Sequence, residues 1–232
     1  MINKNDSFAL FKGKGYIKDP LVEVRTRGGT KAYTTYLHIK RRSEIEDIIP
    51  IIIYEDHLSD EDINGKFIEV EGYVKSRNVI GEDKKRHLRV YVYVANLNIL
   101  HSEIPIDIEE YYNSCEILGY LCNGPVFRIT PKGKKITDLM LAVNYFHSTN
   151  STHSTASYIP AILWSETAVE YSECPHGTRL HAIGRFQSRE YVKDEKTCTA
   201  YEISISNIST ITESLEDSNS DQWNNISLIT LL

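Results

Sequence analysis

Apolar residues alternate with polar ones in short runs along most of the chain, and turn-forming residues separate the runs. This period-2 pattern is typical of half-buried strands. In the first half it predicts strands over the ranges 8–17, 35–39, 49–54, 66–76 and 88–96. In the second half it predicts strands over 115–122, 139–143, 158–164, 178–188 and 200–206. Helical turns are expected at 57–63 and 166–172, between the third and fourth strand of each half.

Five strands with a helix between the third and the fourth are the order of the OB-fold, a small Greek-key barrel. We therefore predict an all-β chain with two tandem OB-fold five-stranded Greek-key barrels, each with a short helix between strands 3 and 4. The predicted domains are a diverged first barrel at 1–104, an acidic linker at 105–112, a second barrel at 113–211 and an acidic, polar tail at 212–232.

The two halves repeat one another, which indicates a duplicated domain. The phrase GYVKSRNV at 72–79 returns as GRFQSREY at 184–191, with Gly first and Ser-Arg fifth and sixth. Gly15-Tyr16 corresponds to Gly119-Tyr120 in the same way, and Ile49-Pro50 to Ile159-Pro160. The last residue of the phrase differs, because Val79 stands where the second copy has Tyr191.

The formal net charge of −6 comes mainly from the linker and the tail. The predicted barrels are near neutral, so the overall acidity does not exclude a polyanionic partner that meets one basic face. The sequence has no apolar run long enough for a membrane span and no signal peptide, so we expect a cytoplasmic protein that does not interact with membranes.

Alternation sorts the predicted strands of the second half into two faces. On the fourth strand, Leu180, Ala182 and Phe186 face inward and Arg185 and Arg189 face outward. On the third strand, Ile159 and Leu163 fill the barrel, which leaves Tyr158 and Trp164 outside. Outward aromatic rings beside arginines suit single-stranded nucleic acid, since bases stack on rings and phosphates meet cations. The alternative is that Trp164 lies under a loop or in a subunit contact.

The second half resembles the bacterial single-stranded DNA-binding protein (SSB) family along nearly its whole length. The residues that carry the resemblance are GYLCNGPVFRITPKGKKITDLMLAVN, YIPAILWSETA, HGTRLHAIGRFQSREY and YEISISNI. The first half matches the same frame more loosely, through residues that include Gly29, Tyr54 and Ser76-Arg77. The chain therefore resembles an SSB with two OB-folds in one polypeptide.

The resemblance implies a set of nucleic-acid-binding residues. The aromatic positions that would stack bases are Tyr158, Trp164, Tyr191, Tyr145 and Phe146. The basic positions in the second half are Arg128, Lys134, Arg185, Arg189 and Lys193. In the first half the resemblance keeps the aromatic Tyr54. The accumulation of cations there separately favours phosphate tracking by residues that include Lys75, Arg77, Arg25, Lys31 and Arg41. Solvated charge is the alternative for the first-half cations, and a subunit contact is the alternative for Tyr191.

The resemblance further implies sequence-independent binding of single-stranded DNA in replication, recombination or repair. We expect a homodimer, nucleoid association, and no enzyme activity, catalytic residue, cofactor or metal. The tail lacks the Pro-Phe tip of the family but is acidic and then apolar, so recruitment of replication or repair proteins through other pockets is one expectation. A short packed segment, or a tail that recruits nothing, is the alternative. The alternatives are an OB-fold that binds RNA or oligosaccharide, an adaptor that mainly binds protein, and a zinc site at Cys174, His176 and Cys198.

Overall fold

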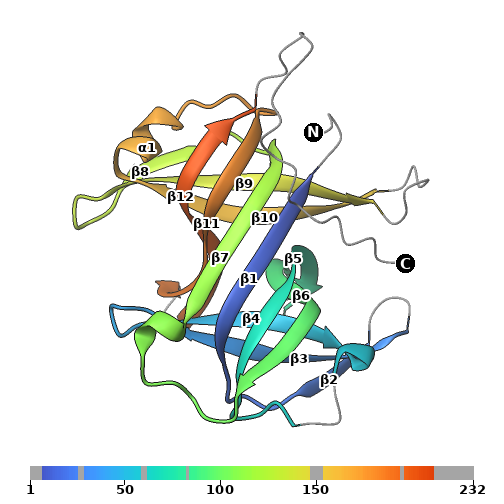
Figure 1. The fold of residues 1–232 in the computed structure, drawn as a ribbon. Helices are drawn as coiled ribbons and strands as arrows, with labels where there is room; N and C mark the ends of the chain where they lie inside the picture. Colours follow the sequence, from blue (N-terminus) through green and yellow to red (C-terminus); the bar gives the residue numbers. More distant parts are fainter. Residues whose placement is uncertain are drawn as a thin grey trace, which may run out of the picture.

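The computed structural model describes residues 7–25, 29–58, 62–81, 84–146, 154–193 and 196–211 (Figure 1). The first half contains β1 (Phe8–Ile17), β2 (Val22–Arg25), β3 (Lys31–Lys40), β4 (Glu46–Tyr54), the 3₁₀ helix η1 (Glu55–His57), β5 (Phe67–Ile80) and β6 (Arg86–His101). The second half contains β7 (Tyr112–Leu121), β8 (Val126–Ile129), β9 (Lys135–Phe146), β10 (Ser154–Trp164), α1 (Ser165–Glu170), β11 (Arg179–Lys193) and β12 (Lys196–Thr210). A further 3₁₀ helix, η2 (Ile108–Glu110), lies between the halves.

The all-β fold class is confirmed, with some added detail. Each predicted strand is present, and the short strands β2 and β8 are additional because each forms a hairpin with the following strand. Helix α1 lies where a helical turn was expected. In the first half the helical turn is η1, which begins before the expected range 57–63, and residues 59–61 of that range lie outside the described part.

Each half closes into a barrel through a second pairing of its first strand. The end of β1 pairs with β3, and the end of β7 pairs with β9. Parallel pairing of β4 with β6, and of β10 with β12, completes the closure. The inward residues Leu180, Ala182 and Phe186 are buried in the core, as the alternation predicted.

The two barrels are joined by antiparallel pairing of β1 with β7, which lie side by side at the centre of Figure 1. The ladder runs from the pair Phe8–Leu118 to the pair Lys14–Tyr112, with Phe11 opposite Cys115 in its middle. Exchanging the two repeats maps this ladder onto itself, so the barrels are related by a pseudo-twofold axis near Phe11 and Cys115. The pairing also covers the free edge that each strand would otherwise expose.

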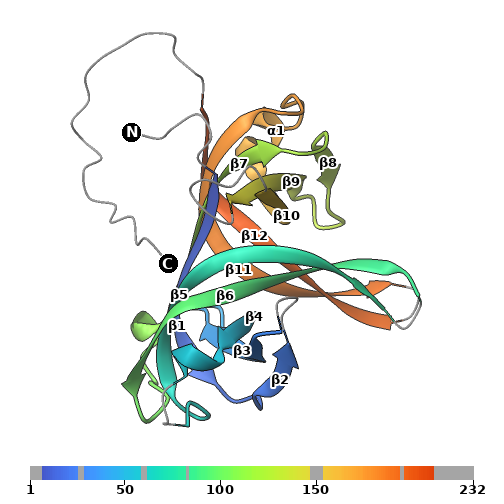
Figure 2. The same cartoon turned by 90° about the vertical axis from the view of Figure 1, so that its right-hand side faces the viewer.

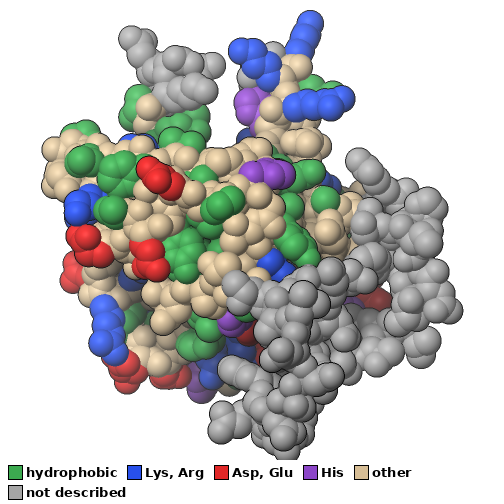
Figure 3. Space-filling model, turned by 90° about the horizontal axis from the view of Figure 1, so that it is seen from above, with side chains coloured by type: hydrophobic (Ala, Val, Ile, Leu, Met, Phe, Trp, Pro, Cys, Tyr) green, Lys and Arg blue, Asp and Glu red, His purple; other side chains and the backbone are tan. Residues whose placement is uncertain are grey.

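Two hairpins extend from the barrels toward the same side of the molecule (Figure 2). We call residues 73–80 and 86–93 of β5 and β6 the first arm, and residues 185–193 and 196–204 of β11 and β12 the second arm. Seen from above, cationic side chains project together from the end of one arm (Figure 3). The described residues of the first-arm tip, Lys84, Lys85 and Arg86, are all exposed.

The glycine that opens the repeated phrase is required by a close approach of two backbones. The ladders of β5 with β6 and of β11 with β12 shift register at Gly72 and Gly184. A Cβ atom on Gly72 would lie 2.2 Å from the carbonyl oxygen of Tyr93, and one on Gly184 would lie 2.3 Å from that of Ser204. Only glycine fits at such a distance from backbone atoms.

The serine of the repeated phrase ties each barrel to the other one. Ser188 Oγ accepts a hydrogen bond from the backbone N–H of Ile48 at 2.8 Å, and Ser76 Oγ accepts one from the N–H of Tyr158 at 2.7 Å. In return, the N–H of Ser188 donates to Asp47 Oδ1, and the N–H of Ser76 donates to Ser157 Oγ, both at 3.3 Å. We call these two symmetric contacts the serine clips.

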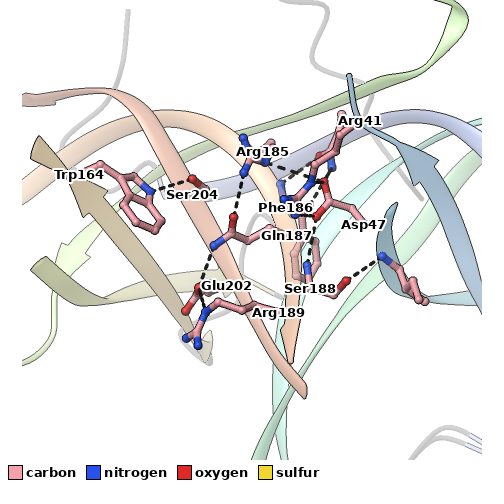
Figure 4. Close-up of polar contacts among 12 residues, drawn as sticks. Arg41, Asp47, Trp164, Arg185, Phe186, Gln187, Ser188, Arg189, Glu202 and Ser204 are labelled. Carbon is pink, nitrogen blue, oxygen red and sulfur yellow. Dashed lines mark hydrogen bonds and ion pairs between the residues drawn. The ribbon is translucent and has the colours of Figure 1, made fainter. Parts of the chain in front are cut away.

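One side of the junction, the ionic seam, is built around Asp47, which is only 1% exposed (Figure 4). The guanidinium of Arg41 binds both carboxylate oxygens, and Nε lies 2.8 Å from Oδ2. Asn113 donates to Oδ2 at 3.2 Å, and Arg185 Nε lies 3.8 Å from the same oxygen. These partners come from both barrels, so the buried charge joins the two halves.

On the opposite side, the aromatic seam, the described residues form no ion pair equivalent to that of Asp47 with Arg41. Ser157 stands at the position of Asp47 and contributes only a hydroxyl. Tyr145 instead donates its hydroxyl proton to the carbonyl oxygen of Val74 in the other barrel at 2.7 Å. Burial raises the pKa of Tyr145, so this hydroxyl stays protonated and remains a donor.

Replacing Asp47 by Ala should lower the free energy of unfolding by about 3–5 kcal/mol, because Arg41 would be left without its buried partner. Glu109→Ala is the matched control, since it removes the exposed ion pair of Glu109 with Arg42, which contributes about 1 kcal/mol or less. Urea unfolding of both variants measures the difference. Equal losses in the two variants would contradict a junction that depends on Asp47.

Candidate nucleic-acid interface

A row of five residues crosses the outer face of the second barrel. Arg128 on β8 stands opposite Ile136 on β9, which in turn stands opposite Trp164 on β10. Trp164 donates its indole N–H to Ser204 Oγ on β12 at 3.0 Å, and Ser204 stands opposite Arg185 on β11 (Figure 4). Neighbouring strands lie about 4.8 Å apart, so the two lateral steps from Arg128 to Trp164 span roughly 10 Å. The indole hydrogen bond then extends the row to Ser204, whose strand partner on β10 is Ile162. The row sets one large aromatic ring between two guanidinium groups.

Trp164 also forms a wall of a shallow, open groove of about 450 Å³. Its lining includes Tyr112 and Ser114 from β7 together with Arg185 and Ser206. Rings, hydroxyls and a cation of the second barrel therefore converge in one groove. Such a lining offers a flat apolar surface for a base and donors for phosphate oxygens.

Arg185 also lines this groove, and its positive charge is only partly neutralised by neighbouring groups. Burial lowers its pKa, and the neighbouring cation Arg41 lowers it further, whereas Asp47 opposes both effects. One terminal nitrogen donates to Gln187 Oε1 at 3.0 Å, while Nε is buried without a hydrogen bond to the protein. An anion in the groove would add the acceptor that this guanidinium lacks.

The polar contacts continue from Arg185 along the second arm toward Tyr191. Gln187 donates to Glu202 Oε1 at 2.8 Å, and Arg189 Nε donates to the same oxygen at 3.2 Å. The guanidinium of Arg189 lies 5.8 Å from the ring centroid of Tyr191, whose side chain is 39% exposed. The second arm thus ends in an accessible ring beside a cation.

The first arm carries a different arrangement, with one lysine surrounded by three tyrosines. Lys75 Nζ lies 5.8 Å from the ring centroid of Tyr73, 5.5 Å from that of Tyr93 and 4.8 Å from that of Tyr145. Burial lowers the pKa of Lys75, and no carboxylate in the described part of the chain forms an ion pair with it. Next along the arm, Arg77 lies over the ring of Tyr91 at 4.8 Å.

The other predicted residues lie apart from these surfaces or are already engaged. Arg41 binds Asp47 and Tyr145 binds Val74, so both lie in the seams between barrels. Tyr54 is half-buried with its ring edge against His57, and Lys31 pairs with Glu55 at 2.7 Å.

Arg25 is exposed at the end of β2, and Lys134 is exposed in the turn between β8 and β9. Arg128 is held by Asp138 at 2.7 Å but remains accessible. The backbones of Phe146 and Lys193 belong to β9 and β11, and their side chains lie outside the described part.

The structure therefore brings Arg128, Trp164 and Arg185 into one row, and it connects Arg185 to Arg189 and Tyr191 through polar contacts. Tyr158 is 40% exposed on the outer face, where the serine clip holds its backbone. Sequence reasoning missed Tyr112 and Ser204, because only the register between strands reveals that they lie beside Trp164 and Arg185.

Among the described residues, no group of three or more His, Cys, Asp or Glu side chains is arranged to hold a metal ion. The four cysteines, including Cys174 and Cys198, are free thiols. No helix in the described ranges is long and apolar enough to cross a membrane.

Comparison with known proteins identifies the second barrel. Residues 112–211 match the model of the single-strand binding protein family. The match spans the second barrel, which is therefore similar to that family. No curated protein sequence matches the chain.

Solved structures share the fold of the whole chain. The wild-type single-stranded DNA binding protein from Thermus aquaticus aligns with a TM-score of 0.68 at 19% identity, covering 92% of this chain and 97% of that one. A deletion mutant of the same protein aligns with a TM-score of 0.65 at 20% identity, covering 92% and 98%. At this identity the likeness concerns the fold, and it extends over both barrels.

The position of Lys75 predicts a pH dependence of stability. The folded chain holds this lysine with a pKa below its ordinary value of 10.5. Between the lowered value and 10.5 the unfolded chain binds the proton more tightly than the native one, so stability should rise with pH through that window. Lys75→Met removes the charge and keeps the packing of the side-chain stem.

The measurement is the difference in unfolding free energy between wild type and Lys75→Met, followed from about pH 7 to about pH 10. Wild type should gain stability relative to the variant as the pH rises. A difference that stays constant would contradict a desolvated ammonium at this position.

Proposed function

We propose that the chain binds single-stranded DNA without sequence preference and acts in replication, recombination or repair as a binding protein rather than an enzyme. The observation that carries this proposal is the lateral row, in which Trp164 stands between Arg128 and Arg185. Rings that stack bases, alternating with cations that hold phosphates, are what sequence-independent binding of a single strand requires. The family match of the second barrel supports the same function.

The two barrels would contribute unequally to binding. The second barrel offers the exposed rings of Tyr158 and Tyr191 together with Trp164, which suit stacking. The outer face of the first arm offers Lys75, Arg77 and Arg89. In this proposal the second barrel holds bases and phosphates, and the first arm mainly tracks phosphates.

Trp164→Ala should weaken binding of an oligo-dT strand by about 1–3 kcal/mol, the usual loss for one stacked base. Trp164→Phe is the control, because it keeps a flat ring and should retain most of the affinity. Fluorescence titration in a Trp223→Phe background reports Trp164 alone, and stacking should quench it. Affinity should also fall linearly with salt on logarithmic axes.

Three results would overturn the proposal: a salt-independent affinity, equal affinity for duplex DNA, or no binding at all. Matching titrations with RNA and with a neutral oligosaccharide test the other ligands that OB-folds accept.

We further propose that two chains form a homodimer, so that four barrels act together. Light scattering at micromolar concentration should give twice the chain mass of 26.6 kDa. A monomeric wild type would contradict the dimer.

A further inference from the structure

Two tyrosines of the second barrel stand on either side of one alanine. Ala142 on β9 is directly opposite Tyr120 on β7 and directly opposite Tyr158 on β10. Directly opposed residues project from the same face of a sheet. The neighbours of Ala142 along β9, Leu141 and Val143, are buried in the core, so all three residues of this row face outward.

The distance between the two tyrosines in this row is suited to one base held between two rings. Three adjacent strands at about 4.8 Å separation place the Cα atoms of Tyr120 and Tyr158 roughly 10 Å apart. A stacked base occupies about 3.4 Å, so a base with a ring on each face needs about 7 Å between the two rings. Ala142 contributes only a methyl group between the two tyrosines.

The first barrel shows the same row with its central position filled. Tyr16, His38 and Ile48 are opposed as Tyr120, Ala142 and Tyr158 are. The imidazole of His38 stacks on Tyr16, with ring centroids 5.2 Å apart and an interplanar angle of 26°. His38 is 2% exposed, so a ring of the protein itself already lies against Tyr16 there.

Charge distinguishes the two rows as well. His38 Nε2 lies 2.5 Å from Asp19 and Nδ1 lies 3.3 Å from Glu46, and the hydroxyl of Tyr16 also binds Glu46. These carboxylates would repel a phosphate, although Lys18 and Lys40 lie near the Tyr16 ring. In the second barrel the guanidinium of Arg179 lies 5.9 Å from the centroid of the Tyr120 ring.

We infer that Tyr120, Ala142 and Tyr158 form a slot that takes one base of a single strand, and that His38 closes the equivalent slot of the first barrel. Tyr120 is thereby a further binding residue, and its partner wall is held by the serine clip from Ser76 to the backbone of Tyr158. This inference rests on the proposed function, since it names a base site within the same interface.

The test is to close the slot with the residue that the first barrel uses. Ala142→His should weaken oligo-dT binding by about 5- to 150-fold, which corresponds to the loss of one stacked base. Ala142→Ser leaves the slot open and should bind like wild type. Tyr120→Ala should weaken binding to a similar extent, whereas Tyr120→Phe should preserve it, and urea unfolding of each variant checks the fold.

Wild-type affinity in both Ala142→His and Tyr120→Ala, alongside a loss in Trp164→Ala, would overturn the slot and leave the proposed function intact. A wild-type chain that does not bind DNA would overturn the proposed function itself. If Ala142→His lowers the free energy of unfolding, the comparison of Tyr120→Ala with Tyr120→Phe decides the question alone.

Discussion

The antiparallel pairing of β1 with β7 is the constraint on which the rest of the structure depends. It fixes a pseudo-twofold axis between the barrels. Around that axis the first arm packs against β10 of the second barrel, and the second arm packs against β4 of the first barrel. The serine clips then join backbone to side chain across both contacts. Because the clips are reciprocal, any displacement of one barrel would break hydrogen bonds at both seams.

Symmetry of the fold does not impose symmetry of chemistry. Asp47 corresponds to Ser157, Lys75 to Gln187, His38 to Ala142 and Val79 to Tyr191. At each pair the backbone has the same place, but one copy contributes charge or bulk and the other does not. In the first barrel Arg41 and His38 are engaged in internal contacts, whereas in the second Tyr191 is exposed and Trp164 is half-buried beside the groove. The changed last residue of the repeated phrase is one instance of this general divergence.

Much of the architecture could be predicted from the sequence because strand alternation and the repeat are local signals. The inward position of Phe186 and the outward position of Trp164 followed from period-2 alternation alone. The contacts between barrels could not be predicted in that way. Tyr145 looks available for a ligand in the sequence but is engaged across a seam, because pairing between distant strands decides its neighbours. Arg41 also looks available, but it binds the buried carboxylate of Asp47 within its own barrel. Tyr120 and Ser204 escaped notice for the same reason.

The central claim is that the second barrel holds the bases of a single strand while the first barrel contributes cations. Photo-cross-linking of a bromodeoxyuridine-containing oligonucleotide, followed by mass spectrometry of the linked peptides, tests it most directly. If the second barrel holds the bases, cross-links should form at the peptides that contain Trp164, Tyr158 and Tyr191, and none should form at Tyr16 or His38. Cross-links concentrated at Tyr16 and His38, or absent from the second barrel, would contradict it.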